Sequence, residues 1–230
     1  MIYLIPSFLA EDAVETIPPY VLDAVKNCQV IFAENERTAR RFLKSMCKEI
    51  VIDNFEWYAI HKVEQEQINT FRQKINEKKN IAIISEAGCP GVADPGQLLI
   101  YEAQKMNVII KPLVGPSSIL LALMASGLNG QHFAFEGYLP IDNVERNKKI
   151  KQLEEESSTK NCTEIFIETP YRNNKLLESV LQICKPSTLL CIASEMTSPD
   201  EWIKTKTIAD WKKEKTDLHK KPVIFLLLGQ

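Results

Sequence analysis

N-I-A-I-I-S-E-A-G-C-P-G-V-A-D-P-G, residues 80–96, is the stretch of sequence that decides the fold. It starts with Ile81 to Ile84, a short apolar run rich in β-branched residues that is typical of a buried parallel strand. Three glycines and two prolines then fall within the nine residues from Gly88 to Gly96. Glycine lets the backbone approach a ligand closely, and proline holds a loop rigid. A rigid loop of this kind, between a strand and a helix, is where open α/β sheets bind ligands. A tight turn without any ligand explains the same residues.

The helix after this loop has its own start signal. Asp94 is placed to be its N-cap and Pro95 its first residue, and the helix is expected to run to Lys105. We therefore expect Asp94 to cap this helix, and a contact with a cofactor is the alternative role.

Strand and helix patterns alternate along the whole chain. In the first half we expect strands at residues 2–5, 30–33, 50–52, 81–84 and 108–112, and helices at 19–27, 36–46 (capped by Asn35), 61–78 and 95–105. In the second half we expect helices at 114–127, 143–158, 170–183 and near Trp211, and strands at 133–137, 164–168, 189–193, 202–206 and 223–228. Such alternation indicates an α/β protein with mostly parallel, helix-covered sheets. We place a domain boundary after residue 113, which gives two α/β domains, 1–113 and 114–230.

The composition excludes several classes of protein. The chain has 230 residues, of which 45% are apolar and 25% charged, and its net charge of −2 gives no overall field for nucleic acid or an anionic membrane. The six cysteines form no C-x-x-C pair and the three histidines are scattered, so we expect reduced packing cysteines and no metal site. The longest apolar stretch, residues 119–124, is far shorter than a membrane span. We expect a cytoplasmic protein with no membrane contact.

Four predicted strands end in small, hydroxyl or proline residues. These ends are residues 85–96, 114–118, 168–172 and 194–197. In a parallel sheet such ends lie at one edge, and between two domains they would line one cleft. Helix capping alone would explain the presence of Ser117 and of Thr169. It explains less well why four strand ends in one chain carry such residues.

Five motifs resemble those of a known family. S-E-A-G-C-P-G-V-A-D-P-G (residues 85–96) resembles S-D-A-G-T-P-x-x-S-D-P-G of the ribosomal RNA small-subunit ribose 2′-O-methyltransferase I family, and V-G-P-S-S (114–118) is similar to its P-G-P-S-A. F-A-F-E-G-Y-L-P (133–140), E-T-P-Y-R (168–172) and A-E-N-E-R (33–37) resemble its F-x-F-x-G-F-L-P, E-S-P-H-R and A-E-D-T-R. That family belongs to the tetrapyrrole-methylase-like (class III) S-adenosylmethionine enzymes.

The resemblance implies two α/β domains of the tetrapyrrole methylase type, a homodimer, and S-adenosylmethionine in the interdomain cleft. It also implies a set of residues that bind the cofactor: Glu86, Ala87, Gly88, Cys89, Val92, Asp94, Ser117, Ser118, Glu168 and Met196.

The chain departs from the family pattern mainly outside the cofactor loops. The first strand is followed by P-S-F-L-A-E-D, from Pro6 through Ser7 to Asp12, where the family has P-I-G-N-L-x-D. Asn35 and Tyr171 replace an aspartate and a histidine of the family, and Ser194 and Ser198 replace two basic residues. The family's acceptor, a ribosomal cytidine, is therefore not assured for this chain.

The chemistry follows from the implied cofactor, whose sulfonium already activates the methyl group. A ribose hydroxyl needs a general base, for which Glu34 and Glu36 are candidates, and Arg37 and Arg172 could hold a phosphate. The leading hypothesis is an S-adenosylmethionine-dependent methyltransferase that acts on RNA. A methylase of a small tetrapyrrole-like or other metabolite and a cofactor-binding protein without catalysis are the alternatives.

Overall fold

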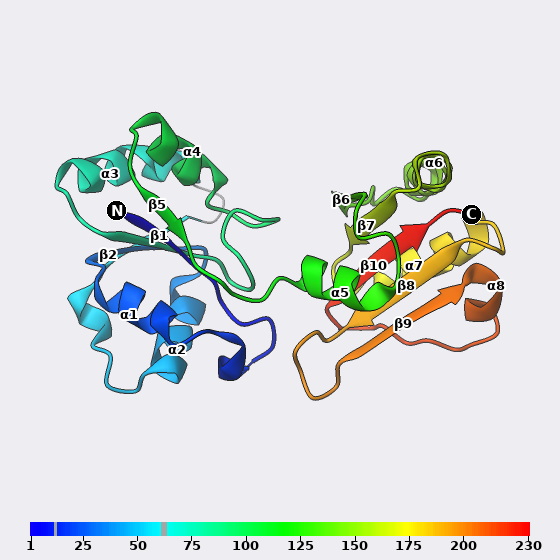
Figure 1. Cartoon of the computed structure of the whole chain (residues 1–230), viewed down its shortest axis with the longest axis horizontal. Helices are drawn as coiled ribbons and strands as arrows, with labels where there is room; N and C mark the ends of the chain where they lie inside the picture. Colours follow the sequence, from blue (N-terminus) through cyan, green and yellow to red (C-terminus); the bar gives the residue numbers. More distant parts are fainter. Residues whose placement is uncertain (12, 61–63) are drawn as a thin grey trace. The chain divides into compact units, whose positions relative to one another are not determined.

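A computed structural model describes residues 1–11, 13–60 and 64–230 (Figure 1). The chain folds into two compact units, Met1–Ser117 and Ser118–Gln230, and each contains one five-stranded sheet. The predicted α/β class is confirmed. The predicted boundary after residue 113 falls close to the division between the units and stays a prediction at the level of single residues.

The sheet of the first unit is entirely parallel. Its strands are β1 (Ile2–Ile5), β2 (Val30–Ala33), β3 (Glu56–Ala59), β4 (Ile81–Ile84) and β5 (Ile110–Pro112), in the order β3-β2-β4-β1-β5. β4 lies between β1 and β2, and Ile84 is in register with both Ile5 and Ala33. The segments that follow β1, β2 and β4 therefore leave the sheet side by side at its carboxyl edge.

Helices cover both faces of this sheet (Figure 1). They are α1 (Tyr20–Lys26), α2 (Glu36–Met46), α3 (Glu64–Asn76) and α4 (Gln97–Lys105). Alternate strand residues point to opposite faces. Ile31 and its same-face neighbours pack with α1 and α2, whereas Phe32 and Ile83 pack with α3 and α4. The continuous burial of β2 and β4 is what a doubly covered parallel sheet requires.

One predicted strand of the first unit is wrong in position. Residues 50–52 form no strand; a 3₁₀ turn occupies Ile52–Asn54 and the strand follows at Glu56–Ala59. Asp and Asn favour turns, whereas Trp57 and Tyr58 suit a strand. The helix predicted over 61–78 is α3, Glu64–Asn76, and residues 61–63 lie outside the described part of the chain. The second 3₁₀ turn of this unit is Val14–Thr16.

The sheet of the second unit is mixed, so the expectation of a mostly parallel sheet is wrong there. Its strands are β6 (Phe133–Tyr138), β7 (Thr163–Ile167), β8 (Leu189–Ser194), β9 (Trp202–Thr207) and β10 (Val223–Leu228), in the order β6-β7-β10-β8-β9. β6 and β7 pair in parallel, and the other three pairs are antiparallel. β8 and β9 are joined only by residues 195–201, which is too short for the crossover that parallel strands need.

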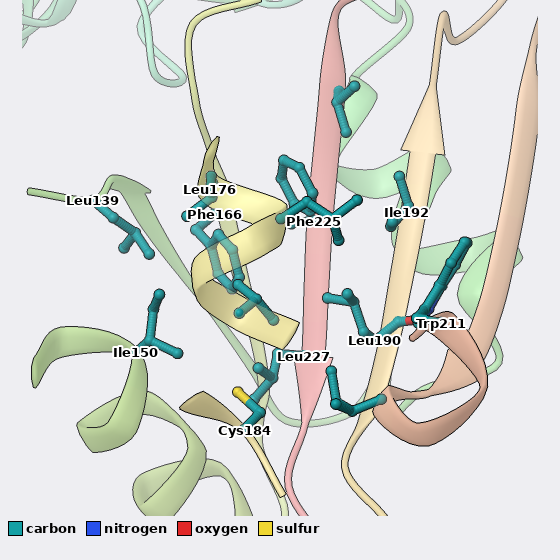
Figure 2. Close-up of a cluster of buried hydrophobic side chains, with 14 of the residues drawn as sticks. Leu139, Ile150, Phe166, Leu176, Cys184, Leu190, Ile192, Trp211, Phe225 and Leu227 are labelled. Atoms are coloured by element: carbon teal, nitrogen blue, oxygen red, sulfur yellow. The ribbon is translucent and has the colours of Figure 1, made fainter. Parts of the chain in front are cut away.

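One face of this sheet packs against α6 (Asn143–Lys160), α7 (Asn173–Ile183) and α8 (Ile208–Trp211). Figure 2 shows the buried side chains of this layer, where the rings of Phe166 and Phe225 stack with centroids 5.7 Å apart. The fourth helix, α5 (Ser118–Ser126), is joined to β9 by a 2.6 Å hydrogen bond from Thr205 Oγ1 to the Ser126 carbonyl. β7 and β8 run in the same direction on either side of β10, so Glu168 and Glu195 leave the sheet at one edge.

Candidate functional site

The loop from Ser85 to Gly96 is held by the segment that follows β1. Ser7 is buried, and its N–H donates to the Gly88 carbonyl at 2.9 Å while the Gly88 N–H donates to the Ser7 carbonyl at 3.1 Å. The Ser7 hydroxyl also donates to the Ser85 carbonyl at 2.8 Å. Three hydrogen bonds therefore fix the path of the loop directly after β4. The sequence carries one signal for this role of Ser7, which is a polar residue placed directly after an apolar strand and a proline.

Gly88 is one of three glycines in this loop, with Gly91 and Gly96, that have a left-handed φ. Its φ of +76° lies in the left-handed region, which disfavours side chains with a branched Cβ. A Cβ added there would meet Leu9 Cδ2 at 3.4 Å and the Pro116 carbonyl oxygen at 3.6 Å. The Cys89 thiol donates to the same Pro116 carbonyl at 3.6 Å. The segments after β1, β4 and β5 thus meet around Gly88.

A second set of contacts joins the loop to the end of β2. The Glu86 N–H donates to Glu34 Oε2 at 2.8 Å, and Glu86 Oε1 accepts from Thr38 Oγ1 at 3.1 Å and from Asn35 Nδ2 at 3.4 Å. Asn35 also caps α2, because its Oδ1 accepts from the N–H groups of Arg37 and Thr38. The predicted cap and the predicted bounds of α2 are confirmed. Two predicted site residues, Glu34 and Glu86, are brought together here.

Asp94 completes a group of three carboxylates with Glu34 and Glu86. Burial raises the pKa of Asp94 from 3.8 to about 7, and the negative charges of Glu34 and Glu86 add to the shift. None of the three carboxylates forms an ion pair with a lysine or arginine that the structure describes. This group is therefore suited to a positively charged ligand, and Asp94 can exchange a proton near neutral pH.

The prediction that Asp94 caps α4 is wrong. α4 begins at Gln97, and its N-cap is Gly96 with φ +115°. Ala93 is also left-handed, and the Gly91 N–H donates to the Pro95 carbonyl, so the loop continues through Asp94 and Pro95. Asp94 has one left-handed residue before it, Ala93, and another after it, Gly96, so the helix cannot begin at Asp94.

The charged residues of α2 differ in how far they are paired. Glu36 Oε2 accepts from Arg40 at 3.1 Å, and the Arg40 guanidinium lies 4.8 Å from the centre of the Trp57 ring. Arg41 pairs with Glu11. Arg37 is exposed and forms no ion pair within the described part of the chain. Of the general-base candidates, Glu36 is therefore engaged by a cation and Glu34 by a backbone N–H.

The remaining predicted cofactor residues of the first unit are accessible. Ala87 is exposed and Val92 is 50% exposed, so both present surface beside the Gly88 turn. Ser117 is the last residue of the first unit and Ser118 begins α5 in the second, and both are partly exposed.

In the second unit, two residues predicted for different roles contact each other. Glu168 Oε1 accepts from Arg172 Nη2 at 2.6 Å and from the Thr169 N–H at 2.6 Å. The Glu168 side chain is only 2% exposed. The positive charge of Arg172 therefore stabilises a buried carboxylate. Because it is already paired, Arg172 is a weaker candidate for a phosphate ligand.

The turn after β8 contains strained and unpaired groups. Glu195 and Thr197 have φ values of +55° and +67°, which are uncommon for residues with a side chain. Within the described residues, the buried hydroxyls of Ser194 and Thr197 have no hydrogen-bond partner. Met196, the predicted cofactor residue between them, is 7% exposed. Strain and unpaired buried polar groups of this kind are concentrated at functional sites.

Comparison with known proteins identifies the family of the chain. The model of the Tetrapyrrole (Corrin/Porphyrin) Methylases matches residues 12–211, which is most of the chain. This chain belongs to the tetrapyrrole methylase family. The predicted membership of the tetrapyrrole methylases and a fold of that type are confirmed. The chain is an S-adenosylmethionine-dependent methyltransferase.

Two related proteins align with nearly the whole length of this chain. The Ribosomal RNA small subunit methyltransferase I of Buchnera aphidicola subsp. Schizaphis graminum is 29% identical over 99% of this chain and 78% of the relative. The protein of the same name from Escherichia coli O157:H7 is 28% identical over 99% of this chain and 77% of the relative.

Solved structures of tetrapyrrole methylases have the same fold. The methyltransferase CobJ has a TM-score of 0.63 at 17% identity, covering 94% of this chain and 89% of CobJ. The cobalt precorrin-4 methyltransferase CbiF has a TM-score of 0.63 at 14% identity, covering 99% of this chain and 94% of CbiF. At these identities the likeness concerns the fold alone.

Two further findings concern the described residues only. No helix among them is long and apolar enough to cross a membrane. No group of three or more His, Cys, Asp or Glu side chains among them could hold a metal ion. The six cysteines are free, and burial raises the pKa of the Cys28 thiol to about 12, in keeping with a role in packing.

Proposed function

We propose that this tetrapyrrole methylase transfers a methyl group from S-adenosylmethionine to a ribose 2′-hydroxyl of ribosomal RNA. The observation that carries the proposal is the similarity, over 99% of the chain, to relatives named Ribosomal RNA small subunit methyltransferase I. Assembly as a homodimer and a cytoplasmic location are parts of the same proposal.

Residues at the strand edge of the first unit support the proposed cofactor. S-adenosylmethionine supplies a methyl group on a positively charged sulfur and also carries an ammonium group. The carboxylates of Glu34, Glu86 and Asp94 have no cationic partner among the described residues and suit such positive charges. The Gly88 turn allows close backbone approach. We propose that the cofactor is bound by the set predicted from the sequence: Glu86, Ala87, Gly88, Cys89, Val92, Asp94, Ser117, Ser118, Glu168 and Met196.

A carboxylate of the first unit is proposed as the general base. A ribose hydroxyl is a poor nucleophile until its proton is removed, and a base is most effective when its pKa is near the working pH. Asp94, with a pKa of about 7, meets that condition. Glu36 is engaged by Arg40, which makes it the weakest of the candidates. We therefore propose that the carboxylate of Asp94 or of Glu34 accepts the proton of the ribose hydroxyl.

Arg37 is the better of the two proposed phosphate ligands. It is exposed and has no ion pair within the described residues, so its guanidinium can bind a phosphate without losing a partner. Arg172 would have to leave the buried carboxylate of Glu168. We propose Arg37 as an RNA contact and Arg172 as a residue that maintains the Glu168 region.

The experiment is transfer of tritiated methyl groups from the cofactor into ribosomal RNA of a strain that lacks the gene. We expect label in small-subunit RNA and none in RNA that already carries the modification. Label in a metabolite extract but not in RNA would favour a small-molecule acceptor. Cofactor binding without transfer to either would contradict the enzymatic proposal.

A further inference from the structure

Two segments of the second unit that are distant in sequence form one rigid surface. They are the turn after β7, at residues 170–174, and the loop before β10, at residues 217–221. Four hydrogen bonds join them: Asn173 Nδ2 to the Lys221 carbonyl (2.7 Å), the Leu218 N–H to Asn174 Oδ1 (2.7 Å), Asn174 Nδ2 to Asp217 Oδ1 (2.8 Å) and the Lys220 N–H to the Pro170 carbonyl (3.0 Å). Asn173 and Leu218 are fully buried beneath the surface. The residues that these segments present to solvent are therefore held in fixed positions.

This surface presents a pair of aromatic rings. Tyr171 is 70% exposed, and its ring lies edge-to-face against that of His219, with centroids 5.9 Å apart and an interplanar angle of 73°. His219 is also exposed. An exposed tyrosine on a rigid turn keeps an aromatic face available at little cost in conformational entropy.

Two lysines without ion pairs lie close in sequence to the pair. Lys175 and Lys220 are exposed, and neither forms an ion pair within the described part of the chain. Lys221 is paired with Glu195 at 2.9 Å, and the acid nearest in sequence to His219, Asp217, accepts hydrogen bonds from Asn174 and from the His219 N–H. Asp217 keeps its negative charge without an ion pair among the described residues, so the unpaired charges at this surface are two lysines and one carboxylate, which leaves a net positive charge.

We infer that Tyr171 and His219 form a stacking platform for an unpaired base of the RNA substrate. This inference rests on the proposed function. Single-stranded RNA is recognised by stacking of splayed bases on aromatic side chains, with basic residues along the backbone. Lys175 and Lys220 supply the phosphate contacts. Arg172, the residue after Tyr171, contacts Glu168, so the platform belongs to the same turn as a proposed cofactor residue.

The test measures binding of a single-stranded oligoribonucleotide of about 10 nucleotides, and of its duplex, to the full chain. Tyr171→Ala should weaken single-strand binding about 5- to 100-fold, and Tyr171→Phe should keep it within about 3-fold, because stacking needs the ring and not the hydroxyl. Lys220→Ala should reduce the salt slope by about 0.7, the value for one phosphate contact on a single strand. Thermal shift by the demethylated cofactor reports folding and cofactor binding in each variant.

Tyr101→Ala is the matched control, because Tyr101 is 63% exposed, lies on α4 of the first unit and has Lys105 Nζ at 5.6 Å from its ring. We expect it to bind RNA like the wild type. If the wild type methylates ribosomal RNA and Tyr171→Ala binds the single strand as well as Tyr101→Ala does, the platform is overturned and the proposed function stands. Equal binding of duplex and single strand by the wild type would also overturn it. If the wild type neither binds nor methylates RNA, the proposed function falls and the platform falls with it.

Discussion

The carboxyl edges of the two sheets differ in how completely their polar groups are paired. In the first unit, the hydroxyl of Ser7 and the carboxylate of Glu86 have partners within the protein, so the loop from Ser85 to Gly96 is built before any ligand arrives. In the second unit, the hydroxyls of Ser194 and Thr197 are buried without a partner among the described residues. A buried polar group without a hydrogen bond costs free energy until another group reaches it. The first edge is therefore a rigid framework, whereas the second holds groups that a ligand can satisfy.

The largest effect is expected in the second unit, from Arg172→Ala. This change leaves the carboxylate of Glu168, 2% exposed, without its cation, and we expect a loss of about 3 kcal/mol in the free energy of unfolding. Adding Glu168→Gln should recover part of the loss, because the buried charge is then gone. Urea denaturation of the single and double variants gives the measurement.

The control for that prediction is Lys213→Ala, which removes an exposed pair with Asp210 and should leave the free energy of unfolding nearly unchanged. If Arg172→Ala is no more harmful than Lys213→Ala, Arg172 does not stabilise Glu168, and its role as a phosphate ligand regains support.

The framework of the first unit is tested by Gly88→Val. A β-branched residue is strained at φ +76° and would crowd the backbone approach at this turn, so we expect cofactor affinity to fall about 50-fold, or about 2 kcal/mol. Titration calorimetry measures the affinity, and circular dichroism should show a retained fold.

Gly127→Val is the matched control for Gly88→Val. Gly127 has φ +69°, and a Cβ there would meet no atom within 4 Å, so this variant carries similar backbone strain away from the loop. It should bind the cofactor like the wild type. Equal losses in both variants would show that strain alone, and not the Gly88 turn, lowers the affinity.

A smaller effect is expected from the charge of Asp94. Its pKa is raised from 3.8 to about 7, so the carboxyl is mostly neutral at pH 6 and mostly ionised at pH 8. A cationic cofactor prefers the ionised form, and we expect the affinity to rise about 5-fold over this range, with Asp94→Asn giving a flat profile. An unchanged profile in Asp94→Asn would remove Asp94 from the proposed cofactor set.

The same shift sets the pH dependence of stability without a ligand. Because the folded-state pKa of Asp94 is above that of the unfolded chain, its contribution to stability is fully present below pH 3.8 and is lost as the pH rises through about 7. Asp94 is only partly buried, so solvent screening limits the loss to about 1 kcal/mol. Asp94→Asn should therefore be more stable than the wild type at pH 8 and equal to it at pH 4, as measured by thermal unfolding.

The smallest effect concerns the RNA contact of α2. Arg37→Ala should weaken binding of single-stranded RNA modestly and reduce the salt slope by about 0.7, because one phosphate contact is lost. Arg40→Ala is the control, since Arg40 already pairs with Glu36. The measurement is the RNA affinity of both variants across a salt series. Equal slopes for Arg37→Ala and the wild type would show that Arg37 on α2 does not contact the RNA.

Local signals in the sequence predicted most helices and strands, because the formation of these elements depends mainly on neighbouring residues. Asn35 precedes an amphipathic run, and the helix has the predicted cap and bounds. Asp94 carries a similar signal, but the left-handed Ala93 and Gly96 override it. The role of Ser7 depends on Gly88, which lies 81 positions later, and no local pattern encodes that contact. The antiparallel pairing of β10 with β7 and β8 also joins distant segments, and no local pattern encodes it. The antiparallel pair of β8 and β9 differs, because the short connection at residues 195–201 is a local signal for it that the expectation of a mostly parallel sheet missed.

The central claim is that the methyl acceptor is a ribose 2′-hydroxyl of small-subunit ribosomal RNA. The most direct test is to incubate the protein with tritiated S-adenosylmethionine and ribosomal RNA from a strain lacking the gene, then digest the RNA and separate its nucleosides. The account predicts label in a single 2′-O-methylated nucleoside, and much less label with Gly88→Val at a limiting cofactor concentration. Label on a base, or label only in a small-molecule extract, would contradict it.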